Sequence, residues 1–155
     1  MWESALPSKP QKIHATATSE ISMPNDNMHK GSCHCGRVTF ELRAGLDAII
    51  ECNCSLCSRK GALWCATDDA HLQILTGEDD LVLYQFGTKT AKHYACRHCG
   101  ISTFSRPRIA PSAWVVNVRC LEGIDVSSLT THPFDGQNWE QSAQRLMQGV
   151  TQGAA

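Results

Sequence analysis

The sequence contains no long apolar run and no excess of positive charge, and each absence restricts what the protein can do. No stretch of about 18 apolar residues is present, so the sequence predicts no membrane-spanning helix. Residues 1–30 contain no apolar run of seven or more residues, which argues against a signal peptide or an anchor. Lysine and arginine number 14 against 15 aspartate and glutamate residues, for a net charge of −1. Without a basic excess to neutralise a phosphate backbone, we expect no nucleic-acid partner.

The sequence also lacks the even, dispersed cysteine pattern of a disulfide-stabilised domain. Its nine cysteines are an odd number, and most of them have the spacing C-x-C or C-x-x-C. Such spacing is typical of metal ligation rather than of a disulfide framework. Metal-binding thiols must stay reduced, so together with the missing signal peptide this pattern predicts a cytoplasmic location.

The 155 residues are enough for one domain, and their composition changes near residue 28. Residues 1–27 contain three of the six prolines, a single aromatic residue and no cysteine. This composition predicts a disordered tail, or coding sequence upstream of a true start at Met28. We therefore expect a metal-binding domain over residues 28–140, followed by a C-terminal helix and tail over 141–155.

Short alternating segments predict a mainly β fold. Val38, Phe40 and Leu42 share one face of a predicted strand from Arg37 to Arg43. Further strands are predicted at 62–67, 71–76, 81–86, 90–95 and 113–119. Turn signals such as Gly77 and Gly87-Thr88 separate several of them.

Only the C-terminal segment has a helical pattern. Asn138 is the predicted N-cap, and Gln141 follows three residues later. The apolar residues Ala143, Leu146 and Met147 then have the spacing of one helix face. The fold class predicted from the residues is mainly β with one short C-terminal helix.

Seven of the nine cysteines fall into three chelating clusters. A C-x-x-C turn directs both sulfurs to one centre, and Gly100 can adopt the positive φ that such a turn often needs. In C-x-C both side chains leave the same face of an extended segment, so these sulfurs can also chelate. The clusters are Cys33 with Cys35, then Cys52, Cys54 and Cys57, then Cys96 with Cys99.

Zinc takes four ligands, so seven cysteines divide naturally into four plus three. The local triplet over 52–57 is the expected open site, because a three-ligand zinc keeps a position for water or substrate. The two pairs lie about 60 residues apart and would form a closed structural site that ties the chain together. Spacing alone leaves other groupings possible, such as the first C-x-C with part of the triplet.

The remaining cysteines and several histidines are weaker candidates. Cys65 follows Trp64 in an apolar segment and is expected in the core, with a fourth ligand for the triplet as the alternative. Cys120 follows Arg119 and is not expected to be a ligand. Histidines inside a chelate turn usually point away from the metal, and those on predicted strands are expected at the surface or in the core. These histidines are His34 and His98 in the turns and His71 and His93 on the strands.

Five stretches carry a resemblance to a known family. They are GSCHCGRVTF (31–40), CNCSLCSRKG (52–61), YACRHCGISTF (94–104), VNVRCLEGI (116–124) and FDGQNW (134–139). In this order they resemble the motifs of the glutathione-dependent formaldehyde-activating enzymes, whose domain is shared with centromere protein V.

The resemblance implies a tent-like, zinc-stabilised all-β fold with two zinc ions per chain. It also implies a carbon–sulfur lyase reaction, in which formaldehyde adds to the thiol of glutathione to give S-hydroxymethylglutathione. The small-molecule partners would be a thiol and an aldehyde. The implied ligands are Cys33, Cys35, Cys96 and Cys99 for a structural zinc and Cys52, Cys54 and Cys57 for a catalytic zinc.

Charges near the triplet suggest where a thiol substrate would bind. Arg59 and Lys60 follow Cys57 directly and could pair with the two carboxylates of glutathione. Arg106 and Arg108 are secondary candidates. Because three thiolates weaken the Lewis acidity of a zinc ion, we expect the site to act on the thiol rather than the carbonyl. The alternatives are a protein that acts on another thiol adduct, or a non-catalytic zinc-binding module.

Overall fold

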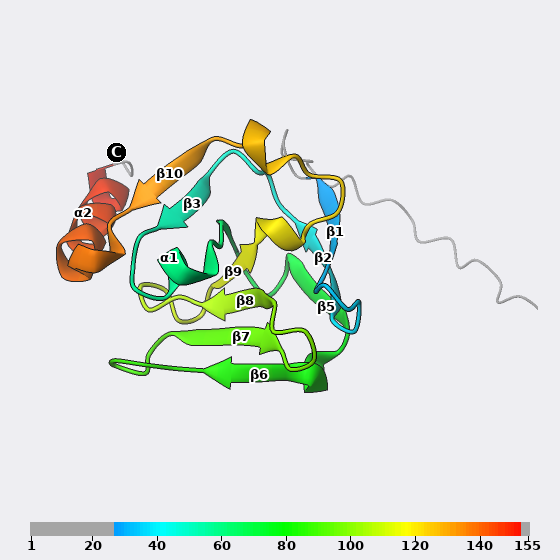
Figure 1. The fold of residues 1–155 in the computed structure, drawn as a ribbon. Helices are drawn as coiled ribbons and strands as arrows, with labels where there is room; N and C mark the ends of the chain where they lie inside the picture. Colours follow the sequence, from blue (N-terminus) through cyan, green and yellow to red (C-terminus); the bar gives the residue numbers. More distant parts are fainter. Residues whose placement is uncertain (1–26, 153–155) are drawn as a thin grey trace, which may run out of the picture.

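The computed structural model describes residues 27–152 and shows a mostly β chain with one long helix near its C-terminal end, which confirms the predicted class (Figure 1). The tail predicted over 1–27 lies outside the described residues, apart from Asn27. The strands are β1 (Met28–Ser32), β2 (Thr39–Arg43), β3 (Ile49–Cys52), β4 (Trp64–Thr67), β5 (Leu72–Thr76), β6 (Leu81–Tyr84), β7 (Lys92–Cys96), β8 (Ser102–Arg106), β9 (Trp114–Asn117) and β10 (Thr131–Phe134). The helices are α1 (Cys57–Lys60) and α2 (Trp139–Gln152), and short 3-10 turns cover Glu78–Asp80, Val118–Cys120, Val126–Ser128 and Gly136–Asn138.

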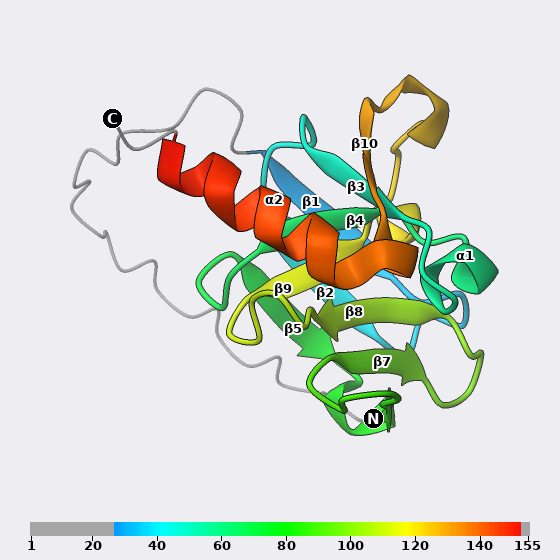
Figure 2. The ribbon, with the colours of Figure 1, turned by 90° about the vertical axis from the view of Figure 1, so that its left-hand side faces the viewer.

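The strands form two sheets (Figures 1 and 2). The smaller sheet has the order β1-β2-β5 and is antiparallel throughout. The larger sheet has the order β10-β3-β4-β9-β8-β7-β6, and only its β10–β3 pair is parallel. Strands β10 and β6 are therefore the two edges of the larger sheet.

One hydrophobic core joins the two sheets. Phe40 on β2 and Phe104 on β8 meet edge to face with ring centroids 4.7 Å apart, and both are buried. Val38 and Leu42 are buried on the same side of the chain as Phe40, as the alternation predicts. Burial of each such side chain contributes about 1.5–3 kcal/mol, so this contact holds the smaller sheet against the larger one.

The predicted strands are present with shifted ends. The first begins at Thr39 rather than at Arg37, because Cys33–Val38 closes a turn through the bond from the Cys33 N–H to the Val38 carbonyl. The others match β4, β5, β6, β7 and β9 within a few residues.

The sequence pattern gave no prediction for β1, β3, β8 or β10, and features of three of them explain why. The first four residues of β8 are all buried, so the alternation between buried and exposed residues is missing there. Strand β10 contains Pro133, which a sheet tolerates on an edge strand. In β1, Gly31 leaves room for the Phe40 ring, which would lie 2.3 Å from a Cβ at this position.

The C-terminal helix begins at Trp139, and the predicted N-cap Asn138 belongs instead to the preceding 3-10 turn. The Asp135 carboxylate accepts the backbone N–H of Asn138 and so caps that turn. Ala143 is buried, whereas Leu146 and Met147 are exposed, so only part of the predicted apolar face is covered. Within residues 27–152 no helix is long and apolar enough to cross a membrane.

Candidate metal centres

Four of the clustered cysteines meet where the smaller sheet approaches β7. Cys33 and Cys35 lie in the turn between β1 and β2, in which Gly36 has a φ of 77°. Cys96 ends β7, and Cys99 lies in the turn that Gly100 closes by donating its N–H to the Cys96 carbonyl. Gly100 has a φ of 75°, the positive value expected from the C-x-x-C-G pattern.

The sulfur positions of this four-cysteine cluster suit a tetrahedral metal. The four Sγ atoms lie within 4.8 Å of one another. The Cys33–Cys35 and Cys35–Cys96 sulfur distances are 3.5 and 3.7 Å. Zinc–sulfur bonds of about 2.3 Å in a tetrahedron place sulfurs about 3.8 Å apart. The donor set and its spacing are therefore consistent with zinc.

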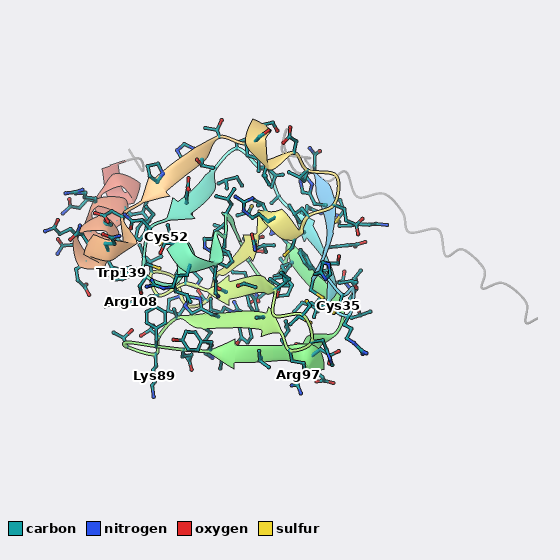
Figure 3. The ribbon with its side chains drawn as sticks, in the orientation of Figure 1. Cys35, Cys52, Lys89, Arg97, Arg108 and Trp139 are labelled. Atoms are coloured by element: carbon teal, nitrogen blue, oxygen red, sulfur yellow. The ribbon has the colours of Figure 1, made fainter. Side chains whose placement is uncertain are left out.

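The other three clustered cysteines form a local triplet. Figure 3 shows its member Cys52 well away from Cys35 of the four-cysteine cluster. Cys52 ends β3, Cys54 lies in the loop that follows, and Cys57 begins α1. Their sulfurs also lie within 4.8 Å of one another, and no fourth Cys, His, Asp or Glu of the described residues joins the group. The cluster could hold a metal ion and leave one coordination position free.

Two neighbours enclose the triplet from different directions. The buried indole of Trp64 donates its Nε1–H to the Cys57 sulfur at 3.4 Å. On the other side, a Cβ at Gly136 would lie 2.6 Å from the Cys52 sulfur and 2.7 Å from the Cys54 Cβ. Only glycine therefore fits at position 136 without displacing the sulfurs.

Hydrogen bonds join the loop that carries the triplet to a segment about 80 residues further along the chain. The Asn53 side chain donates to the Asp135 carboxylate at 3.0 Å and accepts the Gln137 backbone N–H at 3.1 Å. The Asn53 backbone N–H donates to the Phe134 carbonyl at 3.2 Å, and the parallel pairing of β10 with β3 continues this contact. We call residues 134–137 the clasp.

The three thiols of the triplet have different pKa values because they form hydrogen bonds with one another. The thiols of Cys52 and Cys57 can donate to the Cys54 sulfur, which lowers the pKa of Cys54 far below its ordinary value. The contacts of Cys57 with Cys52 and Cys54, together with burial, raise the pKa of Cys57. The backbone N–H of Cys57 also donates to the Cys54 sulfur at 3.3 Å. This arrangement readily provides one thiolate, and a bound cation would favour the other two.

The two basic residues predicted to bind substrate differ in burial and in hydrogen-bond partners. Lys60 is half-buried, and its Nζ donates to the Ser102 hydroxyl at 3.0 Å. Burial lowers the pKa of Lys60, while the charges of Cys57 and Cys54 act in the opposite direction. Lys60 is thus beside the triplet. Arg59 is exposed and donates to the Ser55 carbonyl at 2.7 Å within its own turn.

The two secondary candidates already have acidic partners. Arg106 donates to Asp69 and lies 3.7 Å above the Trp114 ring, and its contact is the main reason that the pKa of Asp69 is lowered. Arg108 pairs with Glu140 at 2.7 Å and lies over the ring of Trp139.

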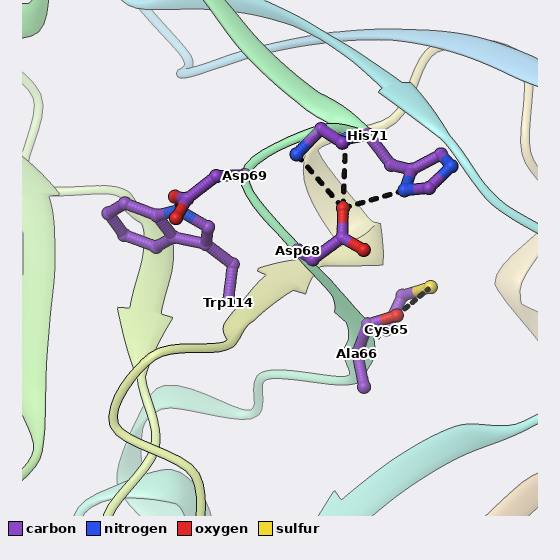
Figure 4. Close-up of polar contacts among 7 residues, drawn as sticks. Cys65, Ala66, Asp68, Asp69, His71 and Trp114 are labelled. Carbon is purple, nitrogen blue, oxygen red and sulfur yellow. Dashed lines mark hydrogen bonds and ion pairs between the residues drawn. The ribbon is translucent and has the colours of Figure 1, made fainter.

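The cysteines outside the clusters belong to the core. Cys65 is buried, and its thiol donates to the Ala66 carbonyl (Figure 4) and to the Gly45 carbonyl. Burial raises the pKa of Cys65 to about 11 and that of Cys120 to about 12. Neither thiol joins a cluster, which agrees with the prediction for both.

None of the four histidines considered as candidates joins a cysteine cluster, and one of them lies near the triplet. His71 is bound to Asp68 at 2.6 Å (Figure 4), and His98 points to Asp80 at 2.7 Å. His34 is exposed. His93 is half-buried and close enough to the triplet for the Cys54 charge to act on it.

Sequence reasoning missed four residues around the triplet: Trp64, Asn53, Gly136 and His93. For Gly136 and Asn53 a signal was present, because both belong to stretches that carry the family resemblance. Trp64 and His93 gave no signal, since each is an ordinary strand residue until the fold places it near the sulfurs.

Comparison with known proteins places this arrangement in context. A solved structure of a Rhodobacter sphaeroides protein matches with a TM-score of 0.63 and 42% sequence identity, covering 67% of this chain and 97% of that one. The family model described as glutathione-dependent formaldehyde-activating enzyme matches residues 28–137. The match spans both cysteine clusters and the clasp, and ends two residues before α2. The chain therefore belongs to the glutathione-dependent formaldehyde-activating enzyme family.

Proposed function

We propose that the protein is a zinc-dependent carbon–sulfur lyase that joins a small thiol, glutathione or a relative of it, to formaldehyde. The product would be an S-hydroxymethyl thiol. One observation carries the proposal: in a chain of this family, three cysteine sulfurs converge with no fourth protein donor among the described residues. A site of this kind has room for a substrate sulfur.

The two clusters are proposed to have different roles. Cys33, Cys35, Cys96 and Cys99 would hold a structural zinc, because four protein ligands leave no open position. Cys52, Cys54 and Cys57 would hold the catalytic zinc. A zinc ion in such a site supplies an open position at which a thiol loses its proton near neutral pH.

Protein groups around the triplet would hold the substrate. Lys60 presents a positive charge beside the sulfurs, which favours an anionic thiol over a neutral one. Arg59, one residue earlier on the exposed face, is proposed to pair with a substrate carboxylate. Trp64 donates to Cys57 and covers that sulfur, so it limits the entry of water from this side.

The proposal is tested by measuring adduct formation from glutathione and formaldehyde with the zinc-loaded protein, using exchange NMR spectroscopy. We expect acceleration over the uncatalysed reaction with wild-type protein and none with Cys54→Ser. Cys65→Ala is the matched control, because this cysteine lies in the core away from both clusters.

The experiment also separates the alternatives. Glutathione binding without acceleration for formaldehyde, but with turnover of another thiol adduct, would indicate a different substrate for the same site. If no thiol binds and Cys54→Ser behaves like wild type in every assay, the protein is a zinc-binding module and the proposal is wrong.

A further inference from the structure

His93 is a titratable side chain beside the triplet that has no assigned role. It lies on β7, and its Nδ1 is 3.1 Å from the hydroxyl of Ser105 on β8. The Phe86 ring stacks on the imidazole with centroids 5.8 Å apart and planes at 22°. Contacts on two sides therefore orient the ring, and within residues 27–152 only Nδ1 has a hydrogen-bond partner.

Lys60 is bonded to the same strand, β8, as His93. Its Nζ bonds to Ser102, and Ser102 and Ser105 are both buried residues of β8. The end of α1 is thereby bonded to β8, the strand that also carries Ser105, the hydrogen-bond partner of His93. Lys60 and Cys54 are the charged groups that act on His93 within residues 27–152.

The surroundings of His93 favour its neutral form. Burial lowers the pKa of His93, the Lys60 charge lowers it further, and the Cys54 charge opposes both. Its other neighbours carry no charge at neutral pH: Tyr84 is its register partner on β6, Phe86 stacks on it and Ser105 bonds to it. A neutral imidazole can accept a proton and later return it.

The proposed reaction requires such a transfer. When a thiol adds to an aldehyde, the carbon–sulfur bond forms, the carbon–oxygen π bond opens, the sulfur loses its proton and the oxygen gains one. No oxidant or reductant is needed, so the only species that must be moved is a proton. The three cysteines are unsuited to this while bound to a metal, because a metal-bound thiolate has no proton to give and would weaken its metal bond by accepting one.

We propose that His93, oriented by Ser105, carries this proton from the substrate thiol to the aldehyde oxygen. The inference rests on the proposed function and adds a residue to it. The competing explanation is that His93 only fills space between β7 and the triplet, which would affect stability but not the dependence of the rate on pH.

The first test compares His93→Gln with wild type in the zinc-loaded protein. We expect kcat to fall about 100-fold or more, the typical contribution of a positioned acid–base group. Zinc content and the Kd for glutathione should stay unchanged. The decline of kcat below the ordinary imidazole pKa of about 6.5 should disappear in the variant. His71→Gln is the control, because His71 bonds to Asp68 away from both clusters, and we expect wild-type kinetics from it.

A second test does not depend on turnover. In the zinc-loaded protein, the His93 ring is titrated by NMR spectroscopy with and without glutathione. A bound thiolate adds negative charge to the site, so the pKa of His93 should rise when glutathione is present. S-methylglutathione provides no thiolate and should cause no such rise.

The outcomes distinguish the inference from the proposed function. If wild type accelerates adduct formation and His93→Gln keeps both its kcat and its acidic limb, the inference is wrong and the proposed function stands. If glutathione leaves the His93 titration unchanged, His93 does not face the substrate and the inference is again wrong. If glutathione shifts the titration but wild type accelerates no adduct formation, the proposed reaction fails together with the proton transfer that it requires.

Discussion

The two cysteine clusters use the same donor atom but are built from different parts of the fold. The four-cysteine cluster joins the β1–β2 turn to the end of β7, so it connects the two sheets directly. Two of its members, Cys33 and Cys96, are buried. The triplet lies within six residues of one loop and depends on Trp64 and the clasp for its shape. The four-cysteine cluster therefore connects two sheets, whereas the triplet belongs to one short segment of the chain.

This difference has a consequence for stability. Metal binding in small zinc peptides contributes about 10–16 kcal/mol, comparable to the whole stability of a domain. For the four-cysteine cluster that free energy is coupled to the contact between the sheets. For the triplet it is coupled only to the order of the 52–57 loop, which hydrogen bonds to the clasp also stabilise.

The largest effect is expected from Cys99→Ser. If this cluster holds the proposed structural zinc, loss of one thiolate would release the metal that connects the two sheets, so the domain should unfold. Circular dichroism and zinc content report the outcome. A folded Cys99→Ser protein that retains one zinc would show that the four-cysteine cluster is not structural.

The next largest effect is expected from Gly136→Ala. The new Cβ would lie 2.6 Å from the Cys52 sulfur and 3.1 Å from the Cys54 backbone nitrogen, so the loop must move. We expect loss of the triplet zinc with the rest of the fold retained, measured by elemental analysis. Gly149→Ala is the matched control, because nothing lies within 4 Å of the Cβ it would add. It should leave zinc content unchanged and stabilise α2 by about 0.5–1 kcal/mol. Retention of both zinc ions in Gly136→Ala would contradict the close packing.

Asn53→Ala should have a moderate effect. It removes the side-chain bonds to Asp135 and Gln137, each with a net contribution of about 0.5–1.5 kcal/mol. The zinc of the triplet should then dissociate faster under a chelator, with little change in the thermal unfolding of the domain. Equal dissociation rates in variant and wild type would show that the clasp does not stabilise the loop.

The smallest effects are expected from the two basic residues of α1. Lys60→Met should weaken glutathione binding about tenfold, because its half-buried charge acts on the triplet sulfurs. Arg59→Met should cost less, since exposed ion pairs contribute about 0.2–1 kcal/mol. Calorimetric Kd values for both variants give the comparison, and a larger loss for Arg59→Met would reverse the proposed order.

The three chelating cysteine clusters could be predicted from the sequence because the spacing of the ligands within each cluster is local. Each C-x-C or C-x-x-C pair is determined by a turn of a few residues, and glycines such as Gly100 mark the positive φ that closes it. The buried face of β2 was predictable for a similar reason, since Val38, Phe40 and Leu42 alternate along one short segment.

The surroundings of the triplet were not predictable, because they depend on contacts between distant segments. His93 lies near Cys54 only because β7 pairs with β8 and β8 holds Lys60. The clasp reaches Asn53 through a parallel strand pair, and periodicity within β10 could not reveal it. The N-cap prediction at Asn138 failed for a local reason, because Asp135, three residues earlier, accepts the Asn138 backbone N–H and caps a 3-10 turn that precedes the helix.

The central claim is that the four-cysteine cluster maintains the fold while the triplet carries the chemistry. The most direct measurement titrates the zinc-loaded wild-type protein with a chelator while zinc content, circular dichroism and adduct formation are followed together. We predict that the first zinc leaves with the dichroism unchanged and activity lost, and that the second leaves only as the chain unfolds. Unfolding with the first zinc, or activity that survives its loss, would contradict the assignment of the two sites.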